Sequence, residues 1–356
     1  MARTHVILVN WNGWQDSAEC LESLLRLSET DFDVTICDNG STDGSVERLV
    51  DWLEGRQQLY DPSPKVWSRI GVERHHLPTY SIVAPDDPIP QSGQPFVTIV
   101  AGRQNLGFAG GNNIGIRRAL ADPACRYIWL LNNDTVVGPD ALAALVARME
   151  ATPEIAVCGS TLLFYGAPDT VQGLGGWFNL WIARGAHIGY RRDAADLPRR
   201  EEVEAEIAYV MGASMFVRRA VFERTGGLCK DYFLYNEEID LARRLLKNER
   251  QAWAANSIVY HKEGGSIGTT SVGRPSNTSV YYLCINLLRF YRKFHPVLLP
   301  LALARNLREL RKYRRSGDGD AAECVRLAIA DFLAGRHHTG PVAISAPERR
   351  QGSRVP

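Results

Sequence analysis

The sequence has almost no excess charge, few cysteines and no long hydrophobic run. Among its 356 residues, 41 Lys and Arg nearly balance 40 Asp and Glu, so no global field attracts the chain to nucleic acid. The seven cysteines are odd in number and include no CxxC pair, which argues against a disulfide framework and a structural zinc site. We therefore expect a cytoplasmic globular protein without a nucleic-acid partner.

Signals for membrane insertion are missing too. No basic and apolar signal segment follows Met1, and the longest strongly apolar stretch near the C-terminus, residues 296–304, is too short to span a bilayer. Neither secretion nor a transmembrane helix is expected. With 45% hydrophobic and 23% charged residues, the chain suits one large domain with extensions or two domains.

A pattern of apolar strand, polar loop and helix occurs four times in the first part of the chain. The pattern predicts strands at 6–10, 34–38, 96–100 and 127–131. It also predicts a helix at 16–27 with Asp16 or Ser17 as its cap, and further helices at 46–53, ending at about 120, and at 141–149. Successive units of this kind form a parallel sheet with right-handed crossovers. Asn10, Asp38, Asn105 and the stretch 132–134 should therefore emerge at one edge of the sheet.

The most informative strand end lies in YIWLLNNDTVVGPD, residues 127–140. Two amides and a carboxylate follow an apolar run there, and open parallel sheets bind their ligands at this edge. Taken alone, Asp134 fits an ordinary Asn/Asp turn better than a ligand site. Its convergence with the other strand ends makes it a candidate site residue.

Two segments depart from this pattern. Residues 55–95 are rich in proline, which predicts a largely irregular insertion with a short hairpin near 79–83. The insertion could be a lid, an oligomer contact or a solvated loop, so a homo-oligomer stays open. Residues 172–190 combine glycines with large aromatics, which suits a mobile loop over a ligand and a packed aromatic hairpin equally well.

Further strands are predicted at 156–164, 207–217 and 252–260, with helices at 218–225 and from an Asn236 cap to about 247. Three acids occupy the first turn of the last helix, where the helix dipole favours them. Asp240 can pair with Arg244 one turn on, whereas Glu237 and Glu238 have no basic partner at that spacing. His261 follows the last strand and precedes glycines, which makes it a better ligand candidate than an isolated histidine.

The C-terminal part, residues 276–338, is predicted to be a helical extension. An apolar stripe over 280–291 should pack on the preceding domain. Residues 296–315 run from apolar to basic, which suits contact with an anionic membrane surface or a solvated helix face. Residues 339–356 have the composition of a disordered tail.

Seven motifs follow one another along the chain: VILVNWNGWQDSAECLESLL, CDNGSTDGS, NLGFAGGNNIGI, LLNNDTVV, GASMFVRRAVFERTGG, FLYNEEIDLARR and HKEGGSIG. Together they resemble, in order, those of family 2 inverting glycosyltransferases with the GT-A fold. They are closest to the rhamnosyltransferase-like branch that builds bacterial surface polysaccharides, over residues 4–295 without the insertion. The resemblance implies a Rossmann-like, mainly parallel sheet with helices on both faces in a domain at 1–275. Residues 1–150 would bind the nucleotide sugar, and 151–275 would hold the acceptor and the catalytic groups.

The resemblance also implies roles for single residues. The 132–134 stretch matches an Asp-x-Asp motif, with Asn132 in place of the first acid, so Asp134 would bind Mg²⁺ or Mn²⁺ and His261 would complete the metal shell. Glu238 matches the general base, and Glu237 is the second candidate. The implied donor-binding residues are Asn10, Trp11, Asn12, Asp38, Asn39, Gly107, Asn113, Asn132 and Asn133.

The implied enzyme moves a rhamnose-like deoxyhexose or a hexose from a nucleoside-diphosphate donor to a glycan or lipid-linked acceptor. A hard cation would neutralise the diphosphate leaving group, and a positioned base contributes about 10² to 10⁴-fold. The enzyme would be cytoplasmic, with peripheral contact to the inner face of the membrane through 296–315. A catalytically silent nucleotide-sugar-binding or scaffolding relative is the main alternative. A nicotinamide-dependent enzyme is disfavoured, because residues 10–14 lack the G-x-G-x-x-G turn.

Overall fold

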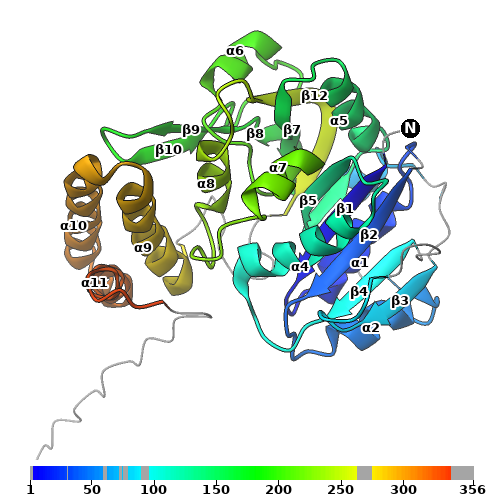
Figure 1. Cartoon of the computed structure of the whole chain (residues 1–356), viewed down its shortest axis with the longest axis horizontal. Helices are drawn as coiled ribbons and strands as arrows, with labels where there is room; N and C mark the ends of the chain where they lie inside the picture. The colour runs from blue at the N-terminus through cyan, green and yellow to red at the C-terminus, as the bar shows by residue number, and fades with distance from the viewer. Residues whose placement is uncertain are drawn as a thin grey trace, which may run out of the picture.

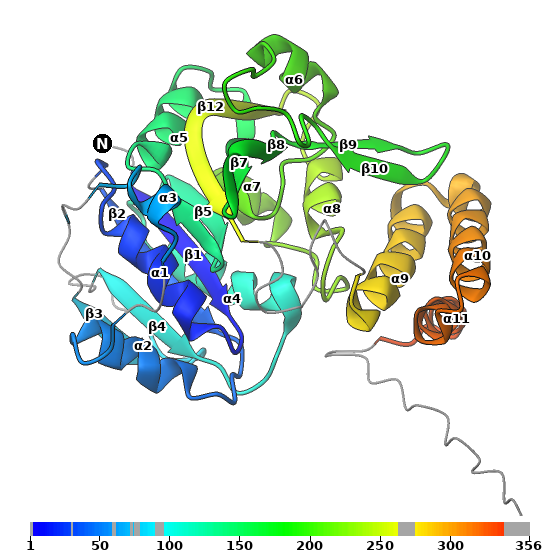
Figure 2. The ribbon, with the colours of Figure 1, turned by 180° about the vertical axis from the view of Figure 1, so that it is seen from behind.

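A mostly parallel sheet forms the centre of the molecule, with helices on both faces and three helices at one side (Figure 1; Figure 2). The computed structural model describes residues 3–29, 31–58, 62–71, 74, 79–89, 96–262 and 275–337. The predicted α/β class with a C-terminal helical extension is confirmed. The disordered tail predicted at 339–356 lies outside the described residues, as do residues 263–274.

The first part of the chain builds the parallel half of the sheet. Its strands lie in the spatial order β3 (Tyr80–Val83), β4 (Val97–Ala101), β2 (Phe32–Asp38), β1 (Thr4–Asn10) and β5 (Tyr127–Asn132). Asn10 lies opposite Asp38 in the register of β1 and β2. The predicted convergence of these strand ends at one edge is therefore confirmed.

The second part of the chain extends the same sheet beyond β5. The added strands are β11 (Ser214–Arg218), β7 (Ile155–Phe164), β12 (Arg250–His261) and β6 (Thr135–Val137), with β8 (Ala167–Gly173) paired to β7. β11 runs antiparallel to both β5 and β7, and β12 runs parallel to β7. The carboxyl end of β12 therefore returns to the edge where β5 ends, which places His261 beside the 132–134 stretch.

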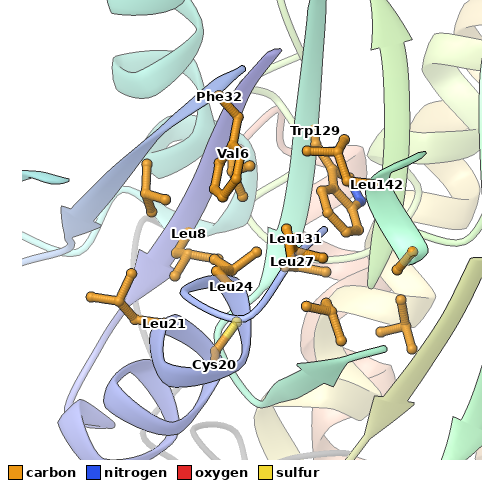
Figure 3. Close-up of a cluster of buried hydrophobic side chains, with 14 of the residues drawn as sticks. Val6, Leu8, Cys20, Leu21, Leu24, Leu27, Phe32, Trp129, Leu131 and Leu142 are labelled. Carbon is orange, nitrogen blue, oxygen red and sulfur yellow. The ribbon is translucent and has the colours of Figure 1, made fainter. Parts of the chain in front are cut away.

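Helices cover the sheet because its strands are apolar on both faces. One face packs on α1 (Trp14–Leu24), α2 (Ser45–Leu53) and α5 (Ala141–Glu150), and the other on α4 (Gly107–Ala121) and α7 (Arg219–Thr225). In the first cluster Val6 and Leu8 of β1 meet Leu21 and Leu24 of α1 near Trp129 (Figure 3). Trp129 Nε1 donates to Ser214 Oγ at 2.9 Å, so the buried ring leaves no polar atom unsatisfied.

The insertion differs from its prediction. Tyr80–Val83 is an edge strand parallel to β4, so the hairpin predicted near 79–83 is wrong, since hairpin strands are antiparallel. A short helix, α3 (Pro64–Trp67), precedes it, and Trp67 Nε1 donates to Glu19 Oε1 at 2.7 Å. Part of the insertion therefore packs on α1.

Three element boundaries also differ. α1 begins at Trp14, and neither Asp16 nor Ser17 caps it, because Ser17 Oγ donates to Asn10 Oδ1 instead. β11 is shorter than the predicted 207–217, because the backbone of residues 208–210 bonds to Gly176 and the Gln251 side chain. The last acidic helix, α8 (Glu237–Arg243), ends four residues early, and Asn236 precedes it without a side-chain cap bond.

The glycine- and aromatic-rich segment forms a packed hairpin of β9 (Gly176–Asn179) and β10 (Arg184–His187). The Phe178 ring meets Phe290 edge-on, with ring centroids 5.8 Å apart. Of the two structures predicted for residues 172–190, the aromatic hairpin is the one observed. Another helix, α6 (Arg200–Glu206), follows this hairpin.

The C-terminal extension consists of α9 (Asn277–Phe294), a 3₁₀ turn η1 (Pro296–Leu298), α10 (Leu299–Arg315) and α11 (Gly319–Leu333). Of the stripe predicted on α9, Val280, Cys284, Leu287, Leu288 and Tyr291 are buried against α11, the β9–β10 hairpin and Phe233, which confirms the packing, whereas Leu283 is 39% exposed. None of the described helices is long and apolar enough to cross a membrane.

Candidate active site

The carboxyl ends of β1 and β2 are joined by a buried polar network. Asn10 Nδ2 donates to Asp38 Oδ1 at 2.8 Å, and Ser17 Oγ donates to Asn10 Oδ1 at the same distance. Asp38 Oδ1 also accepts from Ser41 Oγ at 2.6 Å. Asn10 has no exposed surface, so in this structure it organises the strand ends. Its predicted contact with a donor stays a prediction.

The loops after β2 and β4 are tied to one another. Asn39 Nδ2 donates to Asn105 Oδ1 at 3.0 Å, and the Leu106 backbone N donates to Asn39 Oδ1 at 3.0 Å. Gly107 has a φ of +72°, and a Cβ there would lie 2.2 Å from Phe233 O. Only glycine fits this approach, which joins the loop after β4 to the segment before α8.

The remaining donor candidates occupy different surroundings. Asn12 accepts from the Thr42 backbone N at 2.8 Å and is exposed, and Trp11 beside it is half-buried. Asn113 is buried, and both ends of its amide bond to the Leu228 backbone at 2.8 Å. Asn113 therefore fixes the turn that follows α7, while the loop of Asn12 remains open to solvent.

The ends of β5 and β12 bring Asp134 and His261 together. Asp134 Oδ1 lies 3.1 Å from His261 Nε2, and Asn132 Nδ2 lies 3.3 Å from the same nitrogen. On the other side of the ring, His261 Nδ1 lies 2.9 Å from Gln172 Oε1. The structure thus brings together both residues predicted to bind the metal, Asp134 and His261, and adds Gln172, which the sequence did not single out.

The contact with Gln172 orients the imidazole. With the amide oxygen of Gln172 towards the ring, His261 Nδ1 donates to it and Nε2 faces Asp134. Two electron-rich atoms 3.1 Å apart need a cation between them, either a second ring proton or a metal ion. A carboxylate oxygen suits Mg²⁺ or Mn²⁺, and imidazole nitrogen is a common metal ligand. These residues therefore fit the predicted metal.

Further polar groups surround the Asp134–His261 pair. Asn133 Nδ2 donates to Ser17 Oγ at 3.0 Å, and Lys262 Nζ lies 2.6 Å from Asp16 Oδ1. Burial raises the pKa of Asp16, Lys262 opposes the rise, and the Asp134 charge adds to it. Asp16 is thus a second carboxylate near Asp134. The local sequence pattern gives no sign of this proximity, because Asp16 also fits the position of a helix cap.

The carboxylate pair of α8 follows a strained turn. Tyr235 and Asn236 have φ angles of 67° and 73°, in the left-handed region that disfavours side chains with a Cβ. Glu237 and Glu238 then begin the helix, and their Oε2 atoms are buried with no hydrogen-bond partner among the described residues. Buried acceptors of this kind are rare and often mark functional groups.

Burial and mutual repulsion set the protonation of this pair. Burial raises the pKa of Glu237 well above its usual range, and the Glu238 charge adds to the rise. Burial also raises the pKa of Glu238. Tyr209 lies close enough for the Glu238 charge to add to the rise that burial causes in the Tyr209 pKa. The predicted pair of Asp240 with Arg244 is confirmed at 2.6 Å.

The segment before β11 links the two parts of the candidate site. The Asn132 backbone N donates to Ala213 O at 3.0 Å, and Tyr209, four residues earlier, lies near Glu238. The metal-ligand candidates and the carboxylate pair therefore border the same short segment. They come from separate elements, the strand ends of β5 and β12 and the start of α8.

Another His–Asp cluster lies at the opposite edge of the sheet. His5, Asp33 and Asp122 have ligand atoms within 4.8 Å of one another, close enough to hold a metal ion. Arg3 forms salt bridges with both carboxylates, and its Nε lies 2.9 Å from Asp122. A guanidinium already supplies positive charge here, so this cluster is an ion-pair network at the amino ends of β1 and β2.

The arrangement of the sheet and its covering helices is that of the predicted GT-A fold. A family model for glycosyl transferase family 2 matches residues 5–66 and 87–226, and the chain belongs to this family. The break in the match falls within the predicted insertion. The family and its curated relatives establish the chain as a glycosyltransferase.

Two curated relatives illustrate the range of the family. The low-salt glycan biosynthesis hexosyltransferase Agl10 of Haloferax volcanii is 27% identical over 39% of this chain and 43% of its own length. The N-acetylglucosaminyl-diphospho-decaprenol L-rhamnosyltransferase of Mycobacterium tuberculosis is 23% identical over 74% of this chain and 77% of its own. This chain thus spans less than half of the first relative and about three quarters of the second.

Among solved structures, GalNAc-T7 with UDP, GalNAc and Mn²⁺ superposes with a TM-score of 0.56 at 13% identity, over 93% of this chain and 55% of that one. The mannosyltransferase of Pyrobaculum calidifontis gives a TM-score of 0.48 at 15% identity, over 94% and 76%. At these identities, the first of the two supports the fold.

Proposed function

We propose that this chain is a metal-dependent, inverting glycosyltransferase. It would transfer a rhamnose-like deoxyhexose or a hexose from a nucleoside-diphosphate donor to a glycan or lipid-linked acceptor. The names of the two curated relatives, a hexosyltransferase and a rhamnosyltransferase acting on a decaprenol-linked sugar, support these substrate classes.

The observation that carries this proposal is the oriented Asp134–His261 pair at the carboxyl edge of the sheet. Gln172 fixes the imidazole so that Nε2 faces the carboxylate 3.1 Å away. Asp134 Oδ1 and His261 Nε2 would hold the metal, together with oxygens of the donor. When bound, the cation would supply positive charge to the departing diphosphate.

Glu238 is the proposed base. It would accept the proton of the acceptor hydroxyl as that oxygen bonds to the anomeric carbon, while the bond from this carbon to the diphosphate breaks and inverts the centre. Its buried Oε2 has no hydrogen-bond partner among the described residues, and burial raises its pKa above the usual range of a carboxyl, which makes the carboxylate a stronger base. Burial and the Glu238 charge raise the pKa of Glu237 as well, so the two carboxyls would titrate as a coupled pair, with Glu237 as the second candidate base.

The test combines a donor screen with a substitution at the base. Thymidine, uridine and guanosine diphosphate sugars are screened for metal-dependent binding and slow hydrolysis, which needs no acceptor. With the donor identified, Glu238→Gln should lower sugar transfer by about 10² to 10⁴-fold. Near-normal transfer by the folded variant would remove Glu238 from this role. Failure to release nucleotide from any donor and acceptor would instead favour a silent binding relative.

The raised pKa of Glu238 predicts opposite trends for activity and stability. The base acts as a carboxylate, so activity should be lost as pH falls through the raised pKa. The free energy of unfolding should change in the opposite sense. Below the pKa of the unfolded state, Glu238 is protonated in both states and has no ionisation cost. As pH rises from that value to the raised pKa of the folded state, burial of the group progressively lowers the free energy of unfolding. Glu238→Gln should therefore unfold at a higher temperature than the wild type at neutral pH, which calorimetry can check.

We further propose that the membrane contact predicted for 296–315 includes the tip of the β9–β10 hairpin. The hairpin lies next to α9 and α10 in both views (Figure 1; Figure 2), Leu180 at its tip and Leu298 of η1 pack against the same apolar cluster, and Tyr291 Oη of α9 donates to Leu180 O. Trp181 and Val297 are 71% and 88% exposed, and Trp and apolar side chains favour the bilayer interface. The exposed basic residues of α10 suit anionic headgroups and are Arg308, Arg311, Lys312, Arg314 and Arg315.

Liposome flotation tests this contact. The full chain should float with anionic vesicles and not with neutral ones, and Trp181→Ser combined with Val297→Ser should weaken flotation. Leu333→Ser is a matched control, because Leu333 is also exposed but ends α11. Absence of flotation by the wild type would exclude the contact, and equal loss in the control would exclude the hairpin tip as its site.

A further inference from the structure

The turn that precedes the proposed base has an unfavourable backbone conformation. Tyr235 and Asn236 are both left-handed and neither is glycine, so the turn costs free energy that other contacts must offset. Glu238 follows two residues later in the first turn of α8. The direction of its carboxylate therefore depends on whatever holds this turn in place.

A side chain of the C-terminal extension holds the turn. Asn286 of α9 has no exposed surface, and its Nδ2 donates to Leu234 O at 2.7 Å and to Tyr235 O at 3.1 Å. An amide nitrogen has two hydrogens, so each serves one carbonyl. The two carbonyls belong to the peptide groups on either side of the left-handed Tyr235. Asn286 therefore fixes the orientation of both.

Asn286 is itself held in place. Its Oδ1 accepts from Arg289 Nη1 at 3.1 Å, and the same nitrogen donates to Asp231 O at 2.8 Å. Arg289 Nη2 donates to Arg336 O at 3.0 Å, beyond the end of α11. The amide thus cannot rotate without breaking contacts that reach across the extension.

Other groups on α9 contact the same segment. The Tyr282 ring stacks on Phe233, with centroids 4.9 Å apart, and the hydroxyls of Tyr235 and Ser279 lie 3.0 Å apart. Phe233 O also accepts from the Phe108 backbone N at 2.8 Å, which joins the segment to the loop after β4. Residues 233–235, which precede the proposed base, are therefore held between α9 and the start of α4.

We propose that Asn286 is a positioning residue that sets the direction of the Glu238 carboxylate. The C-terminal extension is then part of the catalytic apparatus, because α9 supplies the hydrogen bonds that hold the turn before α8. This inference rests on the proposed function of Glu238 as the base. It adds a residue that touches neither donor nor metal and acts through the backbone of residues 234–236.

A second buried asparagine in the same extension provides a matched control. Asn306 of α10 also has no exposed surface, and its Nδ2 donates to Cys284 O at 2.9 Å. Its partner carbonyl lies within α9 rather than before the base. Replacing either residue with leucine keeps the side-chain volume and removes hydrogen bonds to buried carbonyl groups, so both variants should lose stability.

The two variants should differ in catalysis. Asn286→Leu should lower kcat by about 10 to 100-fold, because small displacements of a reacting group can cost about that much. The donor dissociation constant, measured by calorimetry with metal present, should change by less than about twofold. Asn306→Leu, assayed well below its unfolding temperature, should keep both kcat and donor binding.

Equal kcat for Asn286→Leu and the wild type would overturn the inference, as would equal losses of kcat in both leucine variants. If Asn286→Leu does not fold, Asn286→Asp keeps the shape and the acceptor for Arg289 but cannot donate when ionised. It should lower kcat in the same way, and full activity would contradict the inference. Full activity of Glu238→Gln would instead refute the base assignment, whatever the result at Asn286.

Discussion

Two clusters of histidine and aspartate lie at opposite edges of the same sheet and have different partners. At the amino edge, His5 Nε2 lies 2.9 Å from Asp122, and Arg3 forms salt bridges with Asp122 and Asp33. At the carboxyl edge, His261 receives a neutral partner, Gln172, at 2.9 Å and faces Asp134. The first cluster is balanced by a guanidinium of the chain itself. The second is oriented by an amide, which adds no charge and leaves the pair suited to a cation.

The largest expected effect is a loss of sugar transfer when a carboxylate is removed at the carboxyl edge but not at the amino edge. Asp134→Ala should lower sugar transfer by about 10³-fold, since a metal contributes several kcal/mol of charge stabilisation. Asp122→Ala removes a carboxylate of similar surroundings at the other edge and should leave transfer within about twofold, assayed below its unfolding temperature. Initial rates of nucleotide release measure both. Comparable losses in the two variants would remove the distinction between the edges.

A smaller effect should follow from changing the neutral partner of His261. Gln172→Leu removes the acceptor for Nδ1 and should weaken metal binding by about 10 to 100-fold, as is typical when the group orienting a metal-bound histidine is lost. Metal titration of the folded variant by calorimetry measures the change. Because Gln172 is fully buried, circular dichroism should confirm the native fold. Unchanged metal affinity would mean that the Gln172 contact is only structural.

The smallest effect concerns the ion-pair network around Arg3. Arg3→Ala should lower the free energy of unfolding by about 1 kcal/mol, because the guanidinium is partly exposed. Burial alone would raise the pKa of Asp122, but hydrogen bonds from His5, the Ala124 backbone and Arg3 lower it overall. Its stabilising contribution is therefore present at neutral pH and lost as pH falls through the folded pKa.

The difference in stability between Arg3→Ala and the wild type should accordingly shrink in acid. Urea unfolding at neutral pH and near pH 3 measures it, and metal affinity should be the same in both proteins. A difference that stays constant with pH would show that Arg3 acts through packing of its alkyl chain. A change in metal affinity would contradict the separation of the two edges.

The sequence predicted the parts of the site that depend on local pattern. Apolar strands followed by Asn and Asp placed Asn10, Asp38 and Asp134 at one edge, because parallel strands must end together. His261, at the end of β12, reaches the same edge because β11 is antiparallel to both β5 and β7, so that β7 and its parallel neighbour β12 run in the direction of β5. Strand direction alone therefore accounted for much of the site.

The parts that the sequence did not reveal depend on contacts between distant segments. Gln172 lies 89 positions before His261 and meets it only because β8 pairs with β7 beside β12. Asn286 lies in a helix whose apolar stripe indicated packing, but the pattern carries no sign of the carbonyls that it contacts. Asp16 fitted a helix cap and instead pairs with Lys262. The spacing of apolar and polar residues along one element does not encode contacts between side chains that lie so far apart in the sequence.

The dependence of donor binding on metal tests the central claim most directly. Calorimetry of the wild-type chain with its nucleoside-diphosphate sugar, with Mn²⁺ or Mg²⁺ and then with excess chelator, should show binding that needs the metal and returns when it is restored. The same titration of Asp134→Ala should show weak binding with or without metal. Donor binding of equal strength in chelator, or in Asp134→Ala with metal, would contradict a metal site at Asp134 and His261.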